Sequence, residues 1–405
     1  MRTFEDACRF LFPRTAGKIK WGLETTERLL AAVGHPERHF ASVHVGGTNG
    51  KGSTSTFVAA ALRALGYRVG LYTSPHLVSF TERIQVDGRP IAEEAVAAWV
   101  RRLEPAAVAT DASFFEITTA IAFGDFAARA VDIAVVEVGL GGRLDATNVI
   151  TPLVAGVTRI ALEHTDYLGT DLAGIAREKA GIAKPGVPLL TTETNPALLE
   201  AMGEVAAARG TRLEPITPTL AAGAPLGLAG AHQVANASLA LALLRRLPPS
   251  FAVDAAAIAD GLAAARIPGR FDRRGRWLFD VAHNPDGMRA LVAALRDAAL
   301  PRPVTAVVAI LGDKAWSEML AVLAPAVDAM ILTRAPTAPV ERAWDLEAAG
   351  RWLAAHAPGI ARSVERDFDA ALARAGAAGG TALVTGSFHT VGDALARLPG
   401  FAPLG

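Results

Sequence analysis

The stretch HVGGTNGKGS, residues 44–53, decides the fold because it leads from an apolar run into a segment of helical spacing. Glycines let the backbone approach an anion closely, and the first N–H groups and the dipole of the helix favour negative charge. Lys51 adds a positive charge, and the hydroxyl of Ser53 can reach a magnesium ion. The stretch therefore predicts a polyphosphate site at a strand–turn–helix junction.

This turn departs from the common P-loop pattern G-x-x-x-x-G-K-[ST] at two positions. Val45 stands where the pattern has its first glycine, and Gly52 stands where it has serine or threonine. Both departures disfavour an ordinary GTPase-like or kinase-like P-loop. A tight structural turn without a ligand stays open as the alternative.

Composition limits the class of protein. A chain of 405 residues is long enough for roughly two or three domains. Lysine plus arginine and aspartate plus glutamate balance at 40 each, so no nucleic-acid partner is expected. The single cysteine, Cys8, excludes an internal disulfide and a multi-cysteine metal site. With no secretory signal and no uncharged apolar run of membrane-spanning length, we expect a cytoplasmic protein without a membrane partner.

Apolar, strand-like runs alternate with helix-like segments, which favours an α/β fold with parallel sheets. The pattern breaks at the basic stretch IPGRFDRR, residues 267–274, and then starts again. We therefore predict two α/β domains, residues 1–267 and 275–405, joined by a hinge at 268–274. The predicted strands are 42–45, 67–72, 133–138, 154–157 and 187–191, then 277–281, 304–311, 329–333 and 382–385.

The third predicted strand ends in an acid. The run DIAVVEV, residues 132–138, is apolar until Glu137. Ligands of open parallel sheets bind at the carboxyl ends of the strands, where nucleotide enzymes place a magnesium ligand or a water-positioning acid. A solvated glutamate at a strand end is the alternative.

Lys179 shares the apolar stripe of a predicted helix with Ile175. A lysine on such a stripe usually extends its amine to solvent. A buried lysine must instead be paired, have a lowered pKa or be chemically modified. We expect His164, Asp166 and Glu178 to cluster beside Lys179, and both interpretations stay open.

The second predicted domain offers two polar turns. FDVAHNPDG, residues 279–287, ends a strand in Asp280 and places His283 in the turn that follows. A strand-end acid can hold a ribose hydroxyl, and a histidine in a turn can contact a phosphate or a carboxylate. TGSFHTV, residues 385–391, provides small polar groups suited to a carboxylate, whereas its His389 carries little information alone. An Asx-rich structural turn is the alternative at Asp280.

Taken in order, these segments resemble the folylpolyglutamate synthase/dihydrofolate synthase family of the Mur-ligase superfamily. The matching pieces span residues 20 to 395 and are individually weak, but their order is specific. They are GTNGKGS, TSPHL, ERI, FFE, EVGLGGRLDATN, HTDYLG, REKAGI, HQVANA, PGRF, DVAHNP and GSFHTV. The resemblance implies an N-terminal P-loop ATPase domain with a mostly parallel sheet and a smaller, Rossmann-like C-terminal domain for glutamate ligation.

The resemblance also implies the reaction. It is ATP- and Mg²⁺-dependent addition of L-glutamate to 7,8-dihydropteroate and to reduced folates, through an acyl phosphate. The ending GSFHTV and the tripeptide LDA at 144–146 are more similar to bifunctional bacterial members. A monomer that closes about its hinge to exclude water is expected.

The residue roles that the resemblance implies are these. The phosphates would lie against Thr48, Asn49, Gly50, Lys51, Gly52 and Ser53. Ser74, Glu137 and His164 would bind magnesium at two sites, supported by a carbamylated Lys179. Asn236, Arg270 and Asp280 would bind the nucleotide. Ser113, Leu144, Asp145 and Ala146 would line the pterin pocket, with Ser113 replacing an expected threonine. His283 and Ser387 would meet the incoming glutamate, and Lys51, Lys179, His164 and His283 would serve catalysis.

Three other functions stay open. The chain could be a monofunctional folylpolyglutamate synthase. It could be a Mur-type ligase acting on another carboxylate, although its P-loop strand begins near residue 42 and leaves little room for a UDP-sugar domain. It could also be a non-catalytic ATP-binding switch, but a switch needs no second metal site like the one expected near His164 and Lys179.

Overall fold

The computed structural model describes residues 3–15, 22–220 and 224–400. The chain divides into two compact units, each considered by itself. Unit 1 comprises Met1–Pro75, Phe80–Gly227 and Gln233–Ala265, and unit 2 comprises His76–Ser79, Leu228–His232 and Arg266–Gly405. The predicted hinge, residues 268–274, falls within unit 2, and its role as a hinge stays a prediction.

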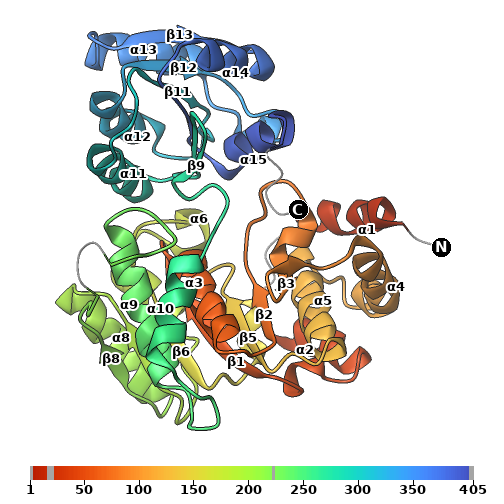
Figure 1. Ribbon diagram of the computed structural model, residues 1–405. Coiled ribbons are helices and arrows are strands. Elements are labelled where there is room, and N and C mark those ends of the chain that lie inside the picture. Colours follow the sequence, from red (N-terminus) through yellow and green to blue (C-terminus); the bar gives the residue numbers. More distant parts are fainter. Residues whose placement is uncertain (1–2, 16–21, 221–223, 401–405) are drawn as a thin grey trace. The chain divides into compact units, whose positions relative to one another are not determined.

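Unit 1 is built on an eight-stranded sheet in the order β4-β3-β2-β5-β1-β6-β7-β8 (Figure 1). Strands β2, β5, β1, β6, β7 and β8 pair in parallel. At one edge of the sheet β3 pairs antiparallel with β2, and β4 pairs antiparallel with β3. The bounds are β1 Ala41–Gly46, β2 Val69–Tyr72, β3 Ile84–Val86, β4 Arg89–Pro90, β5 Ile133–Glu137, β6 Val154–Val157, β7 Leu189–Thr191 and β8 Leu213–Pro215. The prediction of a mostly parallel sheet is confirmed.

Helices cover this sheet and supply most of its core. Those of unit 1 are α1 Phe4–Leu11, α2 Glu24–Ala32, α3 Lys51–Ala64, α4 Glu93–Ala109, α5 Phe114–Ala128, α6 Thr165–Leu168, α7 Leu172–Ala180, α8 Pro196–Ala208, α9 His232–Arg245 and α10 Ala255–Ala264. The long helix α3 is buried along most of its length because α10 packs closely on it. A Cβ at Gly261 of α10 would lie 2.5 Å from the Cα of Ala61, so only glycine allows this approach.

Unit 2 contains a six-stranded sheet in the order β13-β12-β11-β14-β10-β9, parallel except for β9. Its elements are β9 Asp272–Arg274, β10 Trp277–Asp280, α11 Pro285–Asp297, β11 Val304–Val308, α12 Trp316–Leu323, β12 Ala329–Leu332, α13 Leu346–His356, β13 Ala361–Val364, α14 Phe368–Ala377, β14 Thr381–Thr385 and α15 Phe388–Arg397. Alternate residues of β11 enter two separate apolar clusters, one with α11, α12 and α13 and one with α14 and α15. Both faces of the sheet are therefore covered, as expected for parallel strands.

All nine predicted strands are present, with ends that differ by a few residues. The largest difference is at the run 304–311, since β11 ends at Val308 and the chain turns after it. Five strands were not predicted: β3, β4, β8, β9 and β13. Each has only two to four residues, and most of their side chains are partly or fully exposed.

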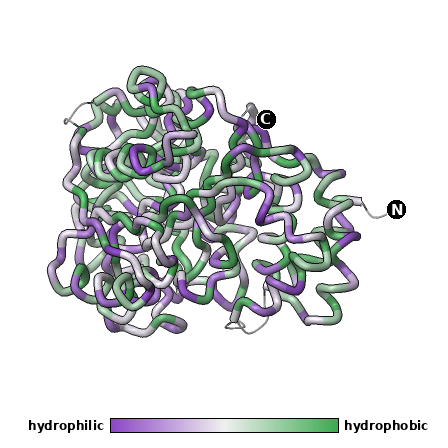
Figure 2. The backbone as a smooth tube through the Cα atoms, turned by 90° about the horizontal axis from the view of Figure 1, so that it is seen from below, coloured by the Kyte–Doolittle hydropathy of each residue, from purple (hydrophilic) through white to green (hydrophobic). Residues whose placement is uncertain are grey.

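Hydrophobic residues are spread along the whole chain. Figure 2 shows hydrophobic and hydrophilic residues alternating along most of the tube, the pattern of elements with one apolar face. Across the described residues, no helix combines the length and the apolar character needed to cross a bilayer. Cys8 lies half-buried on α1 as a free thiol, and burial together with the charge of Glu93 raises its pKa.

Candidate functional site

The glycine-rich turn joins β1 to α3, and its shape requires its glycines. Gly47 and Gly50 have φ values of 128° and 98°. A Cβ at Gly47 would lie 1.9 Å from the hydroxyl of Thr158, and one at Gly50 would lie 2.3 Å from the side-chain oxygen of Asn236. The predicted nucleotide residue Asn236 is therefore placed against the turn, although it lies far along the chain on α9.

Hydrogen bonds fasten the turn to the segment after β6. The backbone N–H of Thr48 donates to the carbonyl of Arg159 at 3.0 Å, and the Thr48 hydroxyl exchanges hydrogen bonds with the backbone of Ala161. The ammonium of Lys51 lies over the turn and donates to the carbonyl of Thr48 at 3.0 Å. A rigid turn is thus presented at the N-terminus of α3 with a cation on top of it, as the anion-site prediction expects.

Glu137 ends β5 and is almost fully buried, with 4% of its surface exposed. Its Oε2 accepts the backbone N–H of Ser74 at 3.1 Å. A Cβ at Gly52 would lie 3.6 Å from that same oxygen, so the glycine at this position leaves space beside the carboxylate. The structure thereby brings together two predicted metal ligands, Glu137 and Ser74, at the first turn of α3.

Lys179 is buried on α7, with 3% of its surface exposed, which rules out the solvent-extended alternative. Its ammonium donates to the carbonyl of Gly47, inside the glycine turn, at 2.9 Å. Burial and the nearby charge of Lys51 lower the Lys179 pKa to about 7, against the opposing influence of Glu163 and Asp145. A lysine that is half neutral near pH 7 can act as a nucleophile or a proton carrier.

The acids predicted around Lys179 lie elsewhere. The carboxylate of Glu178 pairs with the guanidinium of Arg143 at 2.8 Å, so the prediction that it flanks the Lys179 amine is wrong. Neighbouring positions on a helix point in different directions, and this separates Glu178 from Lys179. His164 and Asp166 lie exposed at the start of α6, where His164 adopts a left-handed conformation with a φ of 53°.

Asp145 uses its carboxylate to hold its own loop. Oδ2 accepts the backbone N–H groups of Gly139 and Leu140, and Oδ1 accepts both the N–H and the hydroxyl of Thr147. The Thr147 oxygen also lies 2.9 Å from Nε2 of the fully buried His44. Since the carboxylate is already engaged, contacts to a pterin from this loop would come from the residues beside Asp145.

In unit 2, the strand-end acid Asp280 fastens the turn that precedes it. Its two oxygens each accept a backbone N–H at 2.9 Å, one from Phe271 and one from Ala282. Burial raises the Asp280 pKa, whereas Arg270 lowers it. The guanidinium of Arg270 lies 5.4 Å from the ring centre of Phe388. Asp280 thus shapes the turn that presents Arg270.

His283 has a defined protonation pattern. Its Nδ1 lies 2.9 Å from the carbonyl oxygen of Val281, and because a carbonyl can only accept, Nδ1 carries the proton. Its ring centre lies 5.2 Å from that of Phe388. The structure therefore gathers the predicted residues His283 and Arg270 around one aromatic ring.

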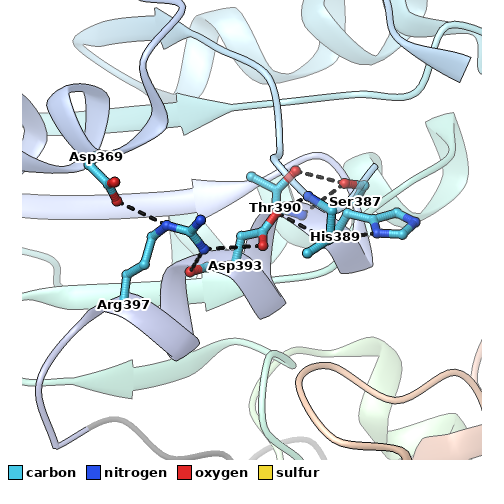
Figure 3. A network of polar contacts seen from close by, with 7 residues as sticks. Asp369, Ser387, His389, Thr390, Asp393 and Arg397 are labelled. Atoms are coloured by element: carbon cyan, nitrogen blue, oxygen red, sulfur yellow. Dashed lines mark hydrogen bonds and ion pairs between the residues drawn. The ribbon is translucent and has the colours of Figure 1, made fainter. Parts of the chain in front are cut away.

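Ser387 is the N-cap of α15, and its Oγ accepts the backbone N–H of Thr390. The Thr390 hydroxyl donates to the carbonyl of Ala309, so the 2.6 Å contact between the two hydroxyls is donated by Ser387 (Figure 3). Ser387 also lines a cavity of about 230 Å³ at the carboxyl ends of β11 and β12. The other lining residues include Ile310, Leu311, Arg334, Pro336, Ala338 and Trp344.

Two family models match the chain. The model of the Mur ligase middle domain matches residues 45–188, and that of the Mur ligase glutamate ligase domain matches residues 269–388. The dihydrofolate synthase/folylpolyglutamate synthase of Escherichia coli is 38% identical, over 92% of this chain and 90% of its own length. The chain belongs to the dihydrofolate synthase/folylpolyglutamate synthase family.

Two solved structures of the dihydrofolate synthase/folylpolyglutamate synthase family are similar over almost the whole chain. E. coli FolC in complex with DHPP and ADP is 34% identical, with a TM-score of 0.85 over 98% of this chain and 97% of that one. A bifunctional enzyme with Mn, AMPPNP and L-glutamate bound is 32% identical, with a TM-score of 0.83 over 98% of both chains.

Longer family relatives also exist. Proteins of Haloferax volcanii and Halobacterium salinarum, named probable bifunctional folylpolyglutamate synthase/dihydropteroate synthase, are 36% and 35% identical. This chain spans about half of their length.

A buried cation to which the sequence analysis gave no role is Arg83, in the motif ERI. It is 6% exposed and faces the rings of Phe114 and Phe115, at 5.0 and 5.7 Å from their centres. Burial lowers its pKa to about 10. Those rings begin α5, which Ser113 caps together with Glu116. The adjacency of an arginine and two phenylalanines distant in sequence left no periodic signal to detect.

Proposed function

We propose that this chain is an ATP-dependent ligase that joins the amine of L-glutamate to the carboxylate of dihydropteroate and of reduced folates. The observation that carries the proposal is the convergence of a buried lysine and a buried carboxylate on one glycine turn. The Lys179 amine contacts Gly47, and the Glu137 carboxylate lies beside Gly52. The ligands of the two solved relatives, ADP with DHPP and AMPPNP with Mn and L-glutamate, support the same substrates here.

The reaction has two steps, which are formation of an acyl phosphate and attack of the amine on it. A carboxylate is a poor acyl donor, and transfer of the γ-phosphoryl group of ATP converts it to an acyl phosphate with a good leaving group. Lys51 and the N–H groups at the start of α3, from Gly50 to Ser53, would neutralise and orient the phosphates. Thr48 and Asn49 would lie against the phosphates and Asn236 would contact the nucleotide. Thr48 and Asn236 also contact the turn itself.

The donor set at the carboxyl end of β5 suits a magnesium ion. In the described parts of the chain, no three His, Cys, Asp or Glu side chains gather as a ligand set. Glu137 and Ser74 are adjacent oxygen donors, and magnesium commonly keeps several waters beside one or two protein oxygens. These two residues would hold the ion, with His164 as the further predicted ligand. Bound there, magnesium would screen the negative charge of the transferring phosphoryl group.

The lowered pKa of Lys179 supports its predicted carbamylation. A neutral amine can add to carbon dioxide, forming an N–C bond and releasing a proton. The product is a carboxylate at the place where burial disfavours an ammonium. That negative group beside the glycine turn would support the second magnesium site.

The remaining predicted contacts stay part of this proposal. Ser113, Leu144, Asp145 and Ala146 would line the pterin pocket, with Asp145 acting through the shape of its loop. Arg270 and Asp280 would contact the nucleotide, and His283 and Ser387 would contact glutamate. The monomeric state and the cytoplasmic location also stay predictions.

Phosphate release by the purified protein tests the proposal. The reaction would contain ATP, Mg²⁺ and glutamate with dihydropteroate, with tetrahydrofolate or with no acceptor, and glutamyl products would be followed by mass spectrometry. We expect release and product with both acceptors. Activity with one acceptor would assign the chain to a single step, and no stimulation by either would reject the folate function.

A further inference from the structure

Thr337, His389 and Asp393 form a hydrogen-bonded relay in unit 2. Figure 3 labels His389 and Asp393 on α15. The Thr337 hydroxyl lies 3.0 Å from Nδ1 of His389 and 3.1 Å from Oδ2 of Asp393. The backbone N–H of Thr337 donates to the same carboxylate oxygen at 3.0 Å. Arg397 donates to the other oxygen of Asp393 at 3.2 Å, and the Asp393 carboxylate is 3% exposed. The relay therefore links the loop after β12 to the first turns of α15.

This arrangement determines which nitrogen of His389 carries the proton. A carboxylate only accepts, so the single hydroxyl proton of Thr337 is donated to Asp393. The contact between Thr337 and His389 must then be donated by the ring, and Nδ1 carries the proton. Nε2 of His389 is left with its lone pair, and within the described part of the chain it has no hydrogen-bond partner.

Close neighbours of the His389 relay line the cavity that Ser387 borders. Thr337 stands between two lining residues, Pro336 and Ala338, and Ser387 is two positions before His389 on the same helix start. The imidazole is half-buried, and in Figure 3 its ring points away from Arg397. Through Thr337 the His389 ring is therefore held close to residues that line a cavity of about 230 Å³, a size suited to a small amino acid.

The charges around His389 favour its neutral form. Burial and the guanidinium of Arg342 lower its pKa, while the carboxylate of Asp393 opposes them. Arg397 in turn binds that carboxylate and also pairs with Asp369 at 2.9 Å. At neutral pH the ring is thus able to take up a proton.

We propose that His389 is the base that takes a proton from the α-ammonium group of the incoming amino acid, an inference that rests on the ligase function proposed above. Nε2 accepts one proton, and the amine nitrogen gains a lone pair. That nitrogen bonds to the carbonyl carbon of the acyl phosphate, and the C–O bond to phosphate breaks with its electron pair leaving on phosphate. The second proton of the amine is released to solvent.

Hydroxylamine separates this step from the rest of the reaction. It is uncharged near neutral pH, so it attacks an acyl phosphate without needing a base and gives a hydroxamate. The test variant is His389→Asn, whose amide can still donate to Thr337 in place of Nδ1 but has no group at the position of Nε2. Thr337→Val is the second variant, because it removes the group that fixes the ring.

For His389→Asn we expect glutamate ligation to fall by about 10²-fold in kcat, with hydroxamate formation and the melting temperature unchanged. For Thr337→Val we expect a fall of about tenfold in glutamate ligation alone, with a shifted acid limb of the pH profile. Wild-type glutamate ligation in His389→Asn would overturn the inference, and so would an equal loss with both nucleophiles. Wild-type protein that forms neither hydroxamate nor glutamyl product would reject the ligase function itself.

Discussion

Each unit of the molecule contains a histidine, a threonine and an aspartate joined in the same order by hydrogen bonds. In unit 1 the relay runs from His44 through Thr147 to Asp145, and in unit 2 it runs from His389 through Thr337 to Asp393. In both, the threonine hydroxyl donates to the carboxylate, so the histidine must donate to the threonine. In both relays the histidine therefore carries its proton on the nitrogen that faces the threonine, which is Nε2 in His44 and Nδ1 in His389.

The relays differ in what surrounds the second ring nitrogen. Nδ1 of His44 is buried, and among the described residues it has no hydrogen-bond partner. Burial together with the charge of Lys184 lowers the His44 pKa to about 3. The His389 ring is only half-buried, and its partner Thr337 stands between two residues that line a cavity. The same hydrogen-bonded unit is thus buried in unit 1 and partly exposed in unit 2, as the role proposed for His389 requires.

The largest expected effect is at Lys179, which tests whether a buried amine can still contribute to catalysis. Although it is as buried as the unit 1 relay, we expect Lys179→Ala to lower ligase turnover by about 10³-fold because it removes a charge beside the phosphates. Added acetate should restore part of the rate if a carbamate is the active form. Turnover assays would be compared with Lys184→Ala, which alters a half-buried lysine that binds the carbonyl of Asn148. Full activity in Lys179→Ala would remove it from the site.

The two aspartates give a matched comparison of stability. Asp145→Ala leaves several buried donors without an acceptor, so we expect a loss of about 3 kcal/mol in the free energy of unfolding. Asp393→Ala should cost about 1 kcal/mol, since Arg397 is partly exposed and can turn to water. Urea unfolding followed by circular dichroism measures both, and each variant removes one negative charge. Equal losses would mean that the two relays do not differ in burial energetics.

The threonines extend the comparison with a smaller change of shape. Thr147→Val leaves the Nε2–H of His44 buried without an acceptor, which should cost about 2 kcal/mol. Thr337→Val should cost less than about 1 kcal/mol, because the His389 ring is partly hydrated. Thermal melting of the two variants beside the wild type would show the ranking, and a larger loss at Thr337 would reverse it.

Low pH should lower the stability of the protein through His44, in the relay of unit 1. Its pKa is lowered from 6.5 to about 3 in the folded protein, so the unfolded chain binds the proton first as the pH falls. The associated stability is present above pH 6.5 and is lost between pH 6.5 and about 3, amounting to about 1.4 kcal/mol by pH 5.5. His44→Gln keeps a donor for Thr147 but cannot titrate. Its melting temperature should therefore fall less steeply between pH 6.5 and 5, and identical slopes would exclude His44 as the cause.

The strands at the centre of both sheets were predictable because they are buried on both faces and read as continuous apolar runs. The edge strands were not: β4 has two residues and β9 three, too few for a period to be recognised. The glycine turn and the strand-end acid Glu137 were also readable, since each depends on neighbouring residues. The apolar stripe singled out Lys179 but left its burial open, because a lysine on such a stripe can also extend its amine to solvent.

Side-chain partners distant in sequence were beyond prediction. His44 and Thr147 are 103 positions apart, and Thr337 and Asp393 are 56 apart, so no spacing relates them. Asp145 was different, because an aspartate two positions before a threonine is a local capping signal that was interpreted only as part of a pocket. The sequence alone therefore predicted a ligand contact for Asp145 and no role for His389.

Because Cys8 is the single cysteine of the chain, introduced cysteines can be labelled selectively with fluorescent dyes. Because its pKa is raised and it is half-buried, Cys8 should react slowly with maleimides near neutral pH. Cysteines placed at Val108 in unit 1 and Val340 in unit 2, whose side chains are 59% and 88% exposed, would be labelled first. With a donor dye and an acceptor dye on these two positions, the efficiency of energy transfer would report changes in the distance between the units during turnover.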